Sequence, residues 1–256
     1  MQSKKNNLLD TVISEGFSET EARGLILSGK IIVNGKKETK PGILVKSDAK
    51  IEVLQKEKYV SRSAKKLIGG LDDFNVDVGG RICLDLGSST GGFVQVLLER
   101  GAVKVYAVDV GYGILDYSLR SDKRVAVLER HNVRMIEAGW FAAEHLETIR
   151  SGDAGNLFVT CDISFMSIKT VIMSLAGFLR NEKIACEGIF LLKPQFEDSK
   201  NTDEGILADE NLRKKIVDDT LEYASALGFK CMGLQPAKIK GSMGNQEYVI
   251  HLSFSG

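Results

Sequence analysis

The sequence has few of the residues that build metal centres and disulfide frameworks. Its 256 residues include four cysteines and three histidines. Each cysteine falls within an apolar run typical of a strand, which favours a small buried thiol, and the wide spacing rules out close pairs of metal ligands. The sequence therefore predicts neither a metal site nor disulfides. The residues concerned are Cys83, Cys161, Cys186, Cys231, His131, His145 and His251.

Long apolar segments are also absent. No run approaches the roughly 18 apolar residues that a membrane-spanning helix needs. The first residues, Met1–Asn7, lead into no signal-peptide core. We therefore expect a cytoplasmic protein that has no membrane partner.

The formal net charge is zero, but the charge is unevenly distributed. Residues 1–66 hold 14 Lys and Arg against 8 Asp and Glu, a net charge of +6, and the remaining residues hold 20 against 26, a net charge of −6. A basic N-terminal part on an acidic body predicts a small polyanion-binding module joined to a larger domain. Charge alone leaves a chance surface bias as the alternative. The length is sufficient for one large and one small domain.

Residues 81–93 (RICLDLGSSTGGF) read as a buried strand, a glycine turn and the start of an amphipathic helix. Glycines let the backbone approach a ligand closely, and the helix N-terminus offers unpaired N–H groups. The spacing of G-S-S-T-G-G does not match the dinucleotide pattern G-x-G-x-x-G. Asp109 closes the next strand, where a carboxylate can hold ribose hydroxyls. Asp-x-Gly with this later acid resembles the S-adenosylmethionine (SAM) turn of class I methyltransferases; a loop that binds nothing is the alternative.

Strand and helix patterns alternate through the rest of the chain. Strands are predicted at 81–86, 103–108, 125–128, 157–161, 186–192, 229–235 and 247–253, and helices at 91–100, 137–149, 167–180 and 209–227. This alternation predicts an α/β fold, with a mostly parallel, doubly wound sheet and helices on both faces. Ligands of such sheets collect at the carboxyl ends of the strands.

Two of these strands end in ionisable residues that the apolar pattern does not need. Asp162 follows one strand and Lys193 follows the next. If the two strands are neighbours, their ends lie about 4.8 Å apart. Glu247 begins a last strand that would insert antiparallel beside them, and Lys66 lies on a predicted helix that can reach the same rim. The sequence therefore predicts that four ionisable groups converge at one edge of the sheet.

The N-terminal part reads as a small α+β domain. A helix is predicted at 8–15, and a second helix begins after Ser18, with Glu21 at the capping-box position. Asn34-Gly35 indicates a two-residue hairpin. The pattern resembles the RNA-binding domain first seen in ribosomal protein S4. The resemblance implies that phosphates are contacted by four basic residues, Arg23, Lys30, Lys36 and Lys37. We place this domain at 1–58, a linker at 59–63 and the large domain at 64–256.

The four converging residues support a more specific resemblance. Lys66, Asp162, Lys193 and Glu247 look like the Lys-Asp-Lys-Glu tetrad of RNA 2′-O-methyltransferases of the FtsJ/RrmJ type. The strings SRSAKKL, LGSSTGGF, DVGYG, LKPQFE and GNQEY, in this order, are similar to the hemolysin A/TlyA family over nearly the whole chain. The resemblance implies a class I (Rossmann-like) methyltransferase sheet, SAM as cofactor, and a ribose 2′-hydroxyl of ribosomal RNA as substrate, in a cytidine of the large subunit.

The same resemblance implies the residues that hold SAM. The glycine turn would lie near the amino-acid end of the cofactor, and Asp109 would take the ribose hydroxyls. Asn132 would lie near the adenine. Phe93 would pack nearby, although a core position in the helix is an equal alternative. The predicted cofactor residues are Gly87, Ser88, Ser89, Gly91, Gly92, Phe93, Asp109 and Asn132.

The expected chemistry explains why these residue types are needed. Methyl transfer from a sulfonium is an in-line displacement, so positioning supplies most of the catalysis. A ribose hydroxyl must lose its proton, and free lysine, with a pKa of about 10.4, is charged at neutral pH. Lys193, steered by Asp162 and flanked by Lys66, would stabilise the alkoxide or act as the base. Glu247 would orient Lys66 or the ribose.

Two other functions remain open at this stage. One is a pore-forming or hemolytic protein, which the missing apolar segments disfavour. The other is an RNA-binding protein with an inactive methyltransferase domain, which the intact tetrad disfavours. The sequence does not determine the oligomeric state, and we assume a monomer that works on ribosomal RNA or a ribosomal subunit.

Overall fold

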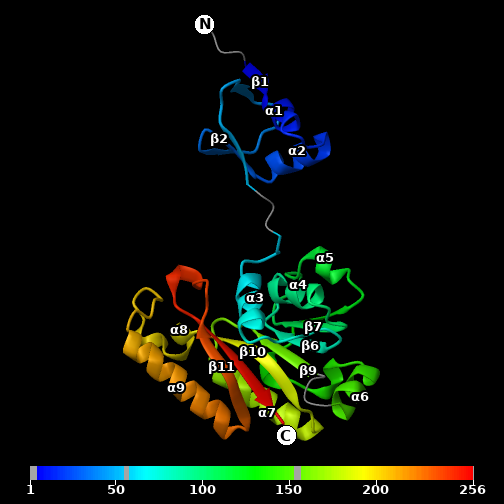
Figure 1. Ribbon diagram of the computed structural model, residues 1–256, viewed down its shortest axis with the longest axis vertical. Helices are drawn as coiled ribbons and strands as arrows, with labels where there is room; N and C mark the ends of the chain where they lie inside the picture. The colour runs from blue at the N-terminus through cyan, green and yellow to red at the C-terminus, as the bar shows by residue number, and fades with distance from the viewer. Residues whose placement is uncertain (1–4, 55–57, 153–156, 256) are drawn as a thin grey trace. The chain divides into compact units, whose positions relative to one another are not determined.

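A computed structural model describes residues 5–54, 58–152 and 157–255 (Figure 1). The chain divides into two compact units, Met1–Lys58 and Tyr59–Gly256. Residues 59–63 fall in the second unit, where the Val60 N–H donates to Gln95 Oε1 at 3.0 Å. Among the described residues, no helix combines the length and the apolar character that crossing a membrane requires.

The described residues of the small unit form two helices and two small sheets. Helix caps and tight turns set where these elements begin and end. The capping box is present, because Glu21 N–H donates to Ser18 Oγ and Ser18 N–H donates to Glu21 Oε2. Asn34 and Gly35 have φ of +50° and +78°, as the predicted hairpin turn requires. The elements are β1 (Lys5–Asn7), α1 (Leu8–Ser14), α2 (Glu19–Leu27), β2 (Ile31–Val33), β3 (Lys36–Glu38), β4 (Leu44–Lys46) and β5 (Ile51–Val53).

In this unit β2 lies between β3 and β5, and β1 pairs with β4. The β1–β4 pair was not predicted, because β1 is a polar three-residue segment without alternation. The core consists of six buried apolar residues, Leu8, Val12, Ala22, Ile26, Ile31 and Val45.

The large unit is built on a seven-stranded sheet with the order β11-β12-β10-β9-β6-β7-β8. All neighbours are parallel except β12, which is antiparallel to both β10 and β11. The predicted fold class is confirmed. The strands are β6 (Ile82–Leu86), β7 (Lys104–Asp109), β8 (Val125–Glu129), β9 (Leu157–Cys161), β10 (Cys186–Leu192), β11 (Phe229–Pro236) and β12 (Tyr248–Phe254).

Helices cover both faces of this sheet (Figure 1). One apolar core lies under α3 (Ala64–Asp73), α4 (Gly92–Glu99) and α5 (Tyr117–Arg120). The other lies under α6 (Ala143–Ser151), α7 (Ile168–Glu182) and α9 (Glu210–Ala226). A one-turn helix, α8 (Pro194–Glu197), follows β10 directly. Strand residues alternate between the two cores, which is why the inner strands read as continuous apolar runs.

Two expectations were wrong in this unit. The helix predicted at 137–149 begins at Ala143, because Ala142 is extended and its N–H donates to Tyr106 Oη at 2.9 Å. Two 3-10 turns, Val133–Met135 and Ala138–Trp140, precede it. Cys231 is an exposed thiol, whereas the other three cysteines are buried. It lies on the edge strand β11, where a bulge and the open face leave most side chains in solvent.

Glu187 belongs to an ion-pair network at the end of the sheet opposite the glycine turn. Glu187 on β10 accepts from His251 Nε2 at 2.7 Å and from Arg81 at 2.6 Å. The hydrogen bond from His251, assisted by Arg81 and opposed by burial, lowers the pKa of Glu187 from 4.5 to about 2. A lowered carboxyl pKa contributes stability that is complete above pH 4.5 and is lost as the pH falls toward 2.

We therefore expect Glu187→Gln to destabilise the large unit most above pH 4.5, with a difference from wild type that shrinks toward pH 2. Denaturant unfolding can be followed by the fluorescence of Trp140, the sole tryptophan, which is buried in this unit. A difference that stays constant between pH 6 and pH 2 would contradict the assignment.

Candidate active site

The glycine turn after β6 is shaped by positive φ angles and close backbone contacts. Gly87 has a φ of +86°, and a Cβ placed there would lie 3.0 Å from the Asp162 carbonyl oxygen. A Cβ on Gly92 would lie 2.5 Å from Ser63 Oγ. The glycines therefore let the turn approach the end of β9 and the segment before α3 closely.

Asp109 at the end of β7 fastens this turn to the next one. Its carboxylate accepts from Ser89 N–H at 2.8 Å and from Gly111 N–H at 2.7 Å. These bonds fix the orientation of the carboxylate, and each oxygen retains a lone pair for a further hydrogen bond. The Asp109 carboxylate can therefore accept further hydrogen bonds.

Asp162 and Lys193 lie on neighbouring strand ends, as the strand order predicted. Lys193 Nζ lies 2.6 Å from Asp162 Oδ1, and both side chains are largely buried, with 8% and 15% exposed. The angles are not those of a hydrogen bond, so the contact is an ion pair. Lys193 Nζ also donates to Ser164 Oγ at 2.9 Å. Lysine has three N–H donors, so one can still point to a ligand.

Lys66 and Glu247 form a second buried pair. Lys66 Nζ donates to Glu247 Oε2 at 2.5 Å, and the two side chains are 10% and 3% exposed. Lys66 lies in the first turn of α3, and Glu247 immediately precedes β12, which inserts beside β10. A Cβ on Gly241 would lie 1.9 Å from Glu247 Oε1, so only glycine fits against this carboxylate.

Both ion pairs line one cavity of about 240 Å³. Its walls also include the glycine turn and one ring from α8. The lining residues are Ser61, Ser63, Lys66, Gly87, Ser88, Ser89, Phe93, Asp162, Ser164, Lys193, Phe196 and Glu247. Polar and charged side chains form most of the lining of this cavity.

A second cavity of about 360 Å³ shares Gly87 and Ser164 with the first. Its walls come from the ends of β6 and β7, the turn after β8 and the loop after β9. They include Asp109, Val110, Asn132, Val133, Arg134, Ile163, Phe165 and Met166. The two cavities therefore adjoin at Gly87 and Ser164.

The other predicted residues differ in where they lie. Phe93 contributes to the first cavity but is only 2% exposed and belongs to the α4 core, which was the stated alternative. Gly91 and Gly92 line neither cavity; they allow close packing, since a Cβ on Gly91 would lie 2.2 Å from Leu119 Cδ1.

The basic residues predicted to contact RNA are not all free on one surface. Arg23 pairs with Glu19 at 2.9 Å on the exposed side of α2. Lys30 is half-buried and lines an apolar groove with Leu25 and Val53. Lys36 and Lys37 are exposed neighbours on β3, where successive side chains point to opposite faces.

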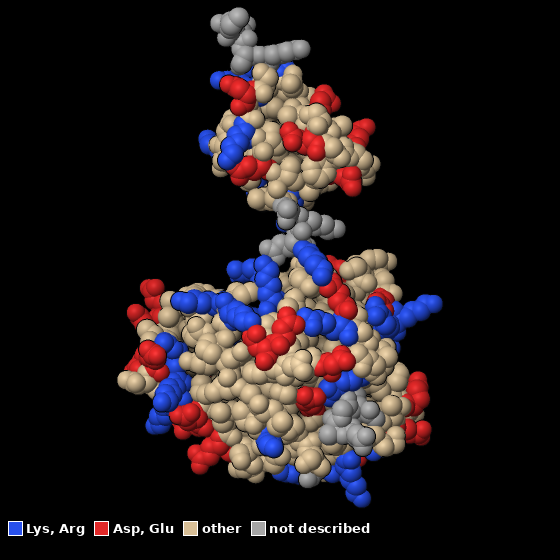
Figure 2. All heavy atoms as spheres, in the orientation of Figure 1, with Lys and Arg blue, Asp and Glu red and all other residues tan. Residues whose placement is uncertain are grey.

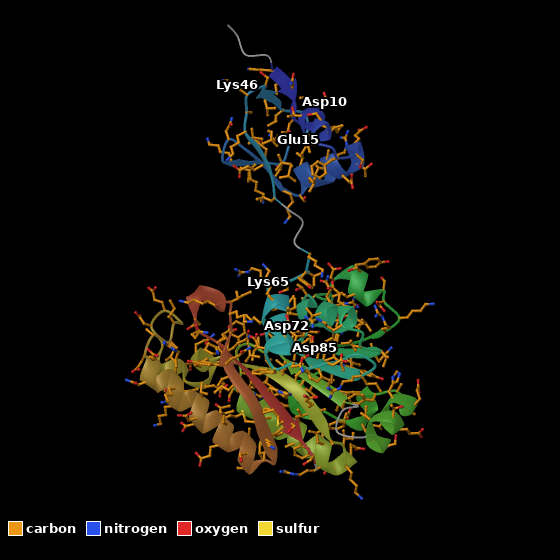
Figure 3. The ribbon with its side chains drawn as sticks, viewed as in Figure 1. Asp10, Glu15, Lys46, Lys65, Asp72 and Asp85 are labelled. Atoms are coloured by element: carbon orange, nitrogen blue, oxygen red, sulfur yellow. The ribbon has the colours of Figure 1, made fainter. Side chains whose placement is uncertain are left out.

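Sequence reasoning missed the environment of Asp85. This residue is fully buried within β6, labelled in Figure 3, and accepts from Thr160 Oγ1 at 2.6 Å. Burial raises the pKa of Asp85 to about 7; the charges of Asp162 and Asp109 add to the rise, and the Thr160 bond opposes it. The only available signal was Thr160, an isolated polar residue in an apolar strand, whose partner depends on strand register.

Comparisons with known proteins point to one family. The sequence model of the FtsJ-like methyltransferase family matches residues 59–254, and that of the S4 domain matches residues 9–51. Hemolysin A of Brachyspira hyodysenteriae is 38% identical over 94% of this chain and 96% of that protein. The 16S/23S rRNA (cytidine-2′-O)-methyltransferase TlyA of Mycobacterium tuberculosis is 39% identical over 92% of this chain and 84% of that protein.

A solved structure shows the same likeness. A protein described as a hemolysin from Streptococcus thermophilus matches with a TM-score of 0.70 at 32% identity, covering 98% of this chain and 89% of the other. The chain therefore belongs to the FtsJ-like methyltransferases of the hemolysin A/TlyA family, and it carries an S4 domain in its N-terminal unit.

Proposed function

We propose that the protein transfers a methyl group from SAM to the 2′-hydroxyl of a cytidine in ribosomal RNA of the large subunit. The observation that carries this proposal is the pairing of Lys193 with Asp162, and of Lys66 with Glu247, in one cavity beside Gly87. The TlyA relative, named as a 16S/23S rRNA (cytidine-2′-O)-methyltransferase, supports the substrate. The family match over residues 59–254 favours this function over the pore-forming alternative.

The residues of the two cavities fit SAM. Asp109 would accept from the ribose hydroxyls, because its carboxylate is already oriented by two backbone N–H groups. Asn132, in the second cavity, would lie toward the adenine, and the turn at Gly87 and Ser88 toward the amino-acid end. Bound SAM would supply an electrophilic methyl group on a sulfonium.

The protein's own groups would position and activate the RNA hydroxyl. A remaining N–H of Lys193 would donate to the 2′-oxygen and stabilise the negative charge that develops there as the hydroxyl proton passes to water and the oxygen takes the methyl group from the sulfonium, whose carbon–sulfur bond breaks. Asp162 and Ser164 hold the Lys193 ammonium in place for this task. Glu247 fixes Lys66 on the other side of the cavity, where a second positive charge favours the same developing alkoxide.

RNA would reach this site over cationic surface. A third cavity of about 200 Å³ shares Ser61, Ser63 and Lys66 with the first and is also lined by Arg62 and Lys240. Lys and Arg side chains gather on the visible rim of the large unit near the start of α3 (Figure 2). Such groups bind phosphates, and the S4 domain would add further contacts through Arg23, Lys30, Lys36 and Lys37.

The proposal is tested by incubating the purified chain with tritiated SAM and ribosomal subunits from a strain that lacks the gene. We expect tritium in large-subunit RNA, at a cytidine whose 2′-oxygen carries a methyl group after the reaction. A synthetic RNA with 2′-deoxycytidine at that position should accept no methyl group. Label on a base, or no transfer to any RNA, would contradict the proposal.

Replacing Gly87 by alanine tests whether the glycine turn contributes to SAM binding. A second glycine with a positive φ controls for the backbone strain that any such substitution causes. Gly87→Ala places a Cβ 3.0 Å from the Asp162 carbonyl oxygen, so the turn and the end of β9 must shift relative to each other beside the cavity. We expect the Kd for SAM, measured by calorimetry, to rise about tenfold or more, equivalent to about 1.4 kcal/mol. Gly80→Ala is the matched control, because Gly80 also has a positive φ, of +72°, but no atom within 4 Å of its Cβ position. Equal Kd values for the two variants would contradict the assignment.

A further inference from the structure

The loop between β9 and α7, residues 162–167, carries part of the site and is fastened at both ends. We call it the β9–α7 loop. At its start Asp162 pairs with Lys193, at the end of β10. At its end it meets Glu197, four residues beyond Lys193 in the same turn. Two neighbouring strands therefore carry their loops side by side, and polar contacts join these loops at each end.

Glu197 makes the contact at the far end with both oxygens of its carboxylate. Oε1 accepts from the Ile168 N–H at 2.7 Å, and Oε2 accepts from Ser167 Oγ at 2.5 Å. Ser167 is the N-cap of α7, and Ile168 is the first residue of this helix. A carboxylate is stabilising at a helix N-terminus, where unpaired N–H groups and the helix dipole meet it. Glu197 therefore fixes where α7 begins.

Between these two contacts the β9–α7 loop has a strained residue, Phe165, and a residue that is hydrogen-bonded to Lys193, Ser164. Phe165 has a φ of +65°, in the left-handed region that is energetically costly for a non-glycine residue. Phe165 is also 91% exposed, so burial of its side chain does not offset this cost. Ser164, its neighbour, accepts the hydrogen bond from Lys193 Nζ. A strained loop of this kind keeps its shape only when the surrounding contacts determine it.

We propose that Glu197 is a positioning residue of the methyl-transfer site. By clamping the start of α7 to the turn after β10, it holds the β9–α7 loop so that Ser164 and Asp162 direct the Lys193 ammonium into the cavity. This inference rests on the proposed function for its catalytic consequence. The clamp itself is a property of the loop and can be measured without RNA.

The test compares Glu197→Ala with Glu197→Gln. Alanine removes both acceptors, whereas glutamine keeps an oxygen for the Ile168 N–H and offers an amide N–H to Ser167 Oγ. Glu182→Ala is the matched control, because Glu182 lies at the other end of α7 and pairs there with Arg150. The measurements are the single-turnover rate of methyl transfer at saturating SAM, the Kd for SAM, and amide hydrogen exchange of residues 163–168.

We expect Glu197→Ala to slow single-turnover transfer by about 10- to 100-fold, since small displacements of a positioned group cost rate on this scale. Glu197→Gln should recover the rate to within about threefold of wild type, and Glu182→Ala should match wild type. Amides 163–168 should exchange faster only in Glu197→Ala. Wild-type rate and exchange in Glu197→Ala, or equal effects of Glu197→Ala and Glu182→Ala, would overturn the proposal.

Failure of the proposed function and failure of the Glu197 clamp give different results. If wild-type protein methylates no RNA, the proposed function fails, while unchanged exchange in Glu197→Ala would separately overturn the clamp. If Glu197→Ala does not fold, Ser167→Ala replaces it; it removes the bond to Glu197 Oε2 together with the N-cap bond from the Lys169 N–H, and it leaves the Ile168 N–H bond. Ser167→Ala should slow single-turnover methyl transfer by less than the 10- to 100-fold expected when both bonds are lost, and amides 163–167 should exchange faster. An unchanged rate together with unchanged exchange would overturn the proposal.

Discussion

Lys193→Ala is expected to lower the rate of methyl transfer about 1,000-fold while the Kd for SAM stays within about threefold of wild type. Loss of a preorganised donor at a site of developing charge costs about 10²–10³ in rate, and Lys193 would also fix the ribose. The substitution also leaves Asp162 without its cation in a largely buried position. Rates are measured in single turnovers with tritiated SAM, and cofactor affinity is measured by calorimetry.

Lys104→Ala provides the control for removal of a lysine. Lys104 begins β7, at the opposite end of the parallel strands, and donates to the Lys123 carbonyl there. The Lys104→Ala protein should transfer methyl groups at the wild-type rate. A Lys193→Ala enzyme that retains more than about a tenth of the wild-type rate would show that Lys193 is not the group that holds the 2′-oxygen.

Glu247→Ala is expected to destabilise the large unit by about 3 kcal/mol and to abolish activity. Removal of one partner of a buried ion pair leaves the other as an uncompensated buried charge, which typically costs about 3–5 kcal/mol. Lys66 is that partner here, with 10% of its side chain exposed. Denaturant unfolding followed by Trp140 fluorescence reports on this unit alone, because the S4 domain contains no tryptophan.

Two variants separate stability from function in this experiment. The double variant Lys66→Met with Glu247→Leu removes both charges, so it should regain stability to within about 1 kcal/mol of wild type and remain inactive. Asp72 lies on the same helix as Lys66, α3, and forms an exposed pair with Arg100 at the end of α4; Asp72→Ala should cost less than about 1 kcal/mol. A Glu247→Ala protein as stable as Asp72→Ala would contradict the buried pair.

Much of the fold could be predicted from the sequence because the apolar pattern of each strand is nearly uninterrupted. The bounds of β9 and β10 were predicted to the residue, since both are buried on two faces and end at a charged residue. The convergence of Asp162, Lys193 and Glu247 follows from strand order, which places three strand ends at one edge. The catalytic and cofactor roles of these residues stay predictions.

Other features depend on contacts that sequence patterns do not encode. The Asp85–Thr160 bond requires the register of β6 against β9, and the start of α6 depends on a hydroxyl of Tyr106. Glu197 reads as one more acid in a charged loop, because its partners, Ser167 and Ile168, are 30 and 29 residues away. Such pairings become visible only when neighbouring loops are placed in space.

The antiparallel strand β12 has a consequence for the order in which the enzyme becomes competent during synthesis. Lys66 meets Glu247 across 181 residues of chain, and this meeting requires β12 to insert between β10 and β11. Contacts between such distant residues form late in folding. During synthesis the S4 domain therefore leaves the ribosome well before this ion pair can form, because the pair needs β12 to emerge and join the sheet.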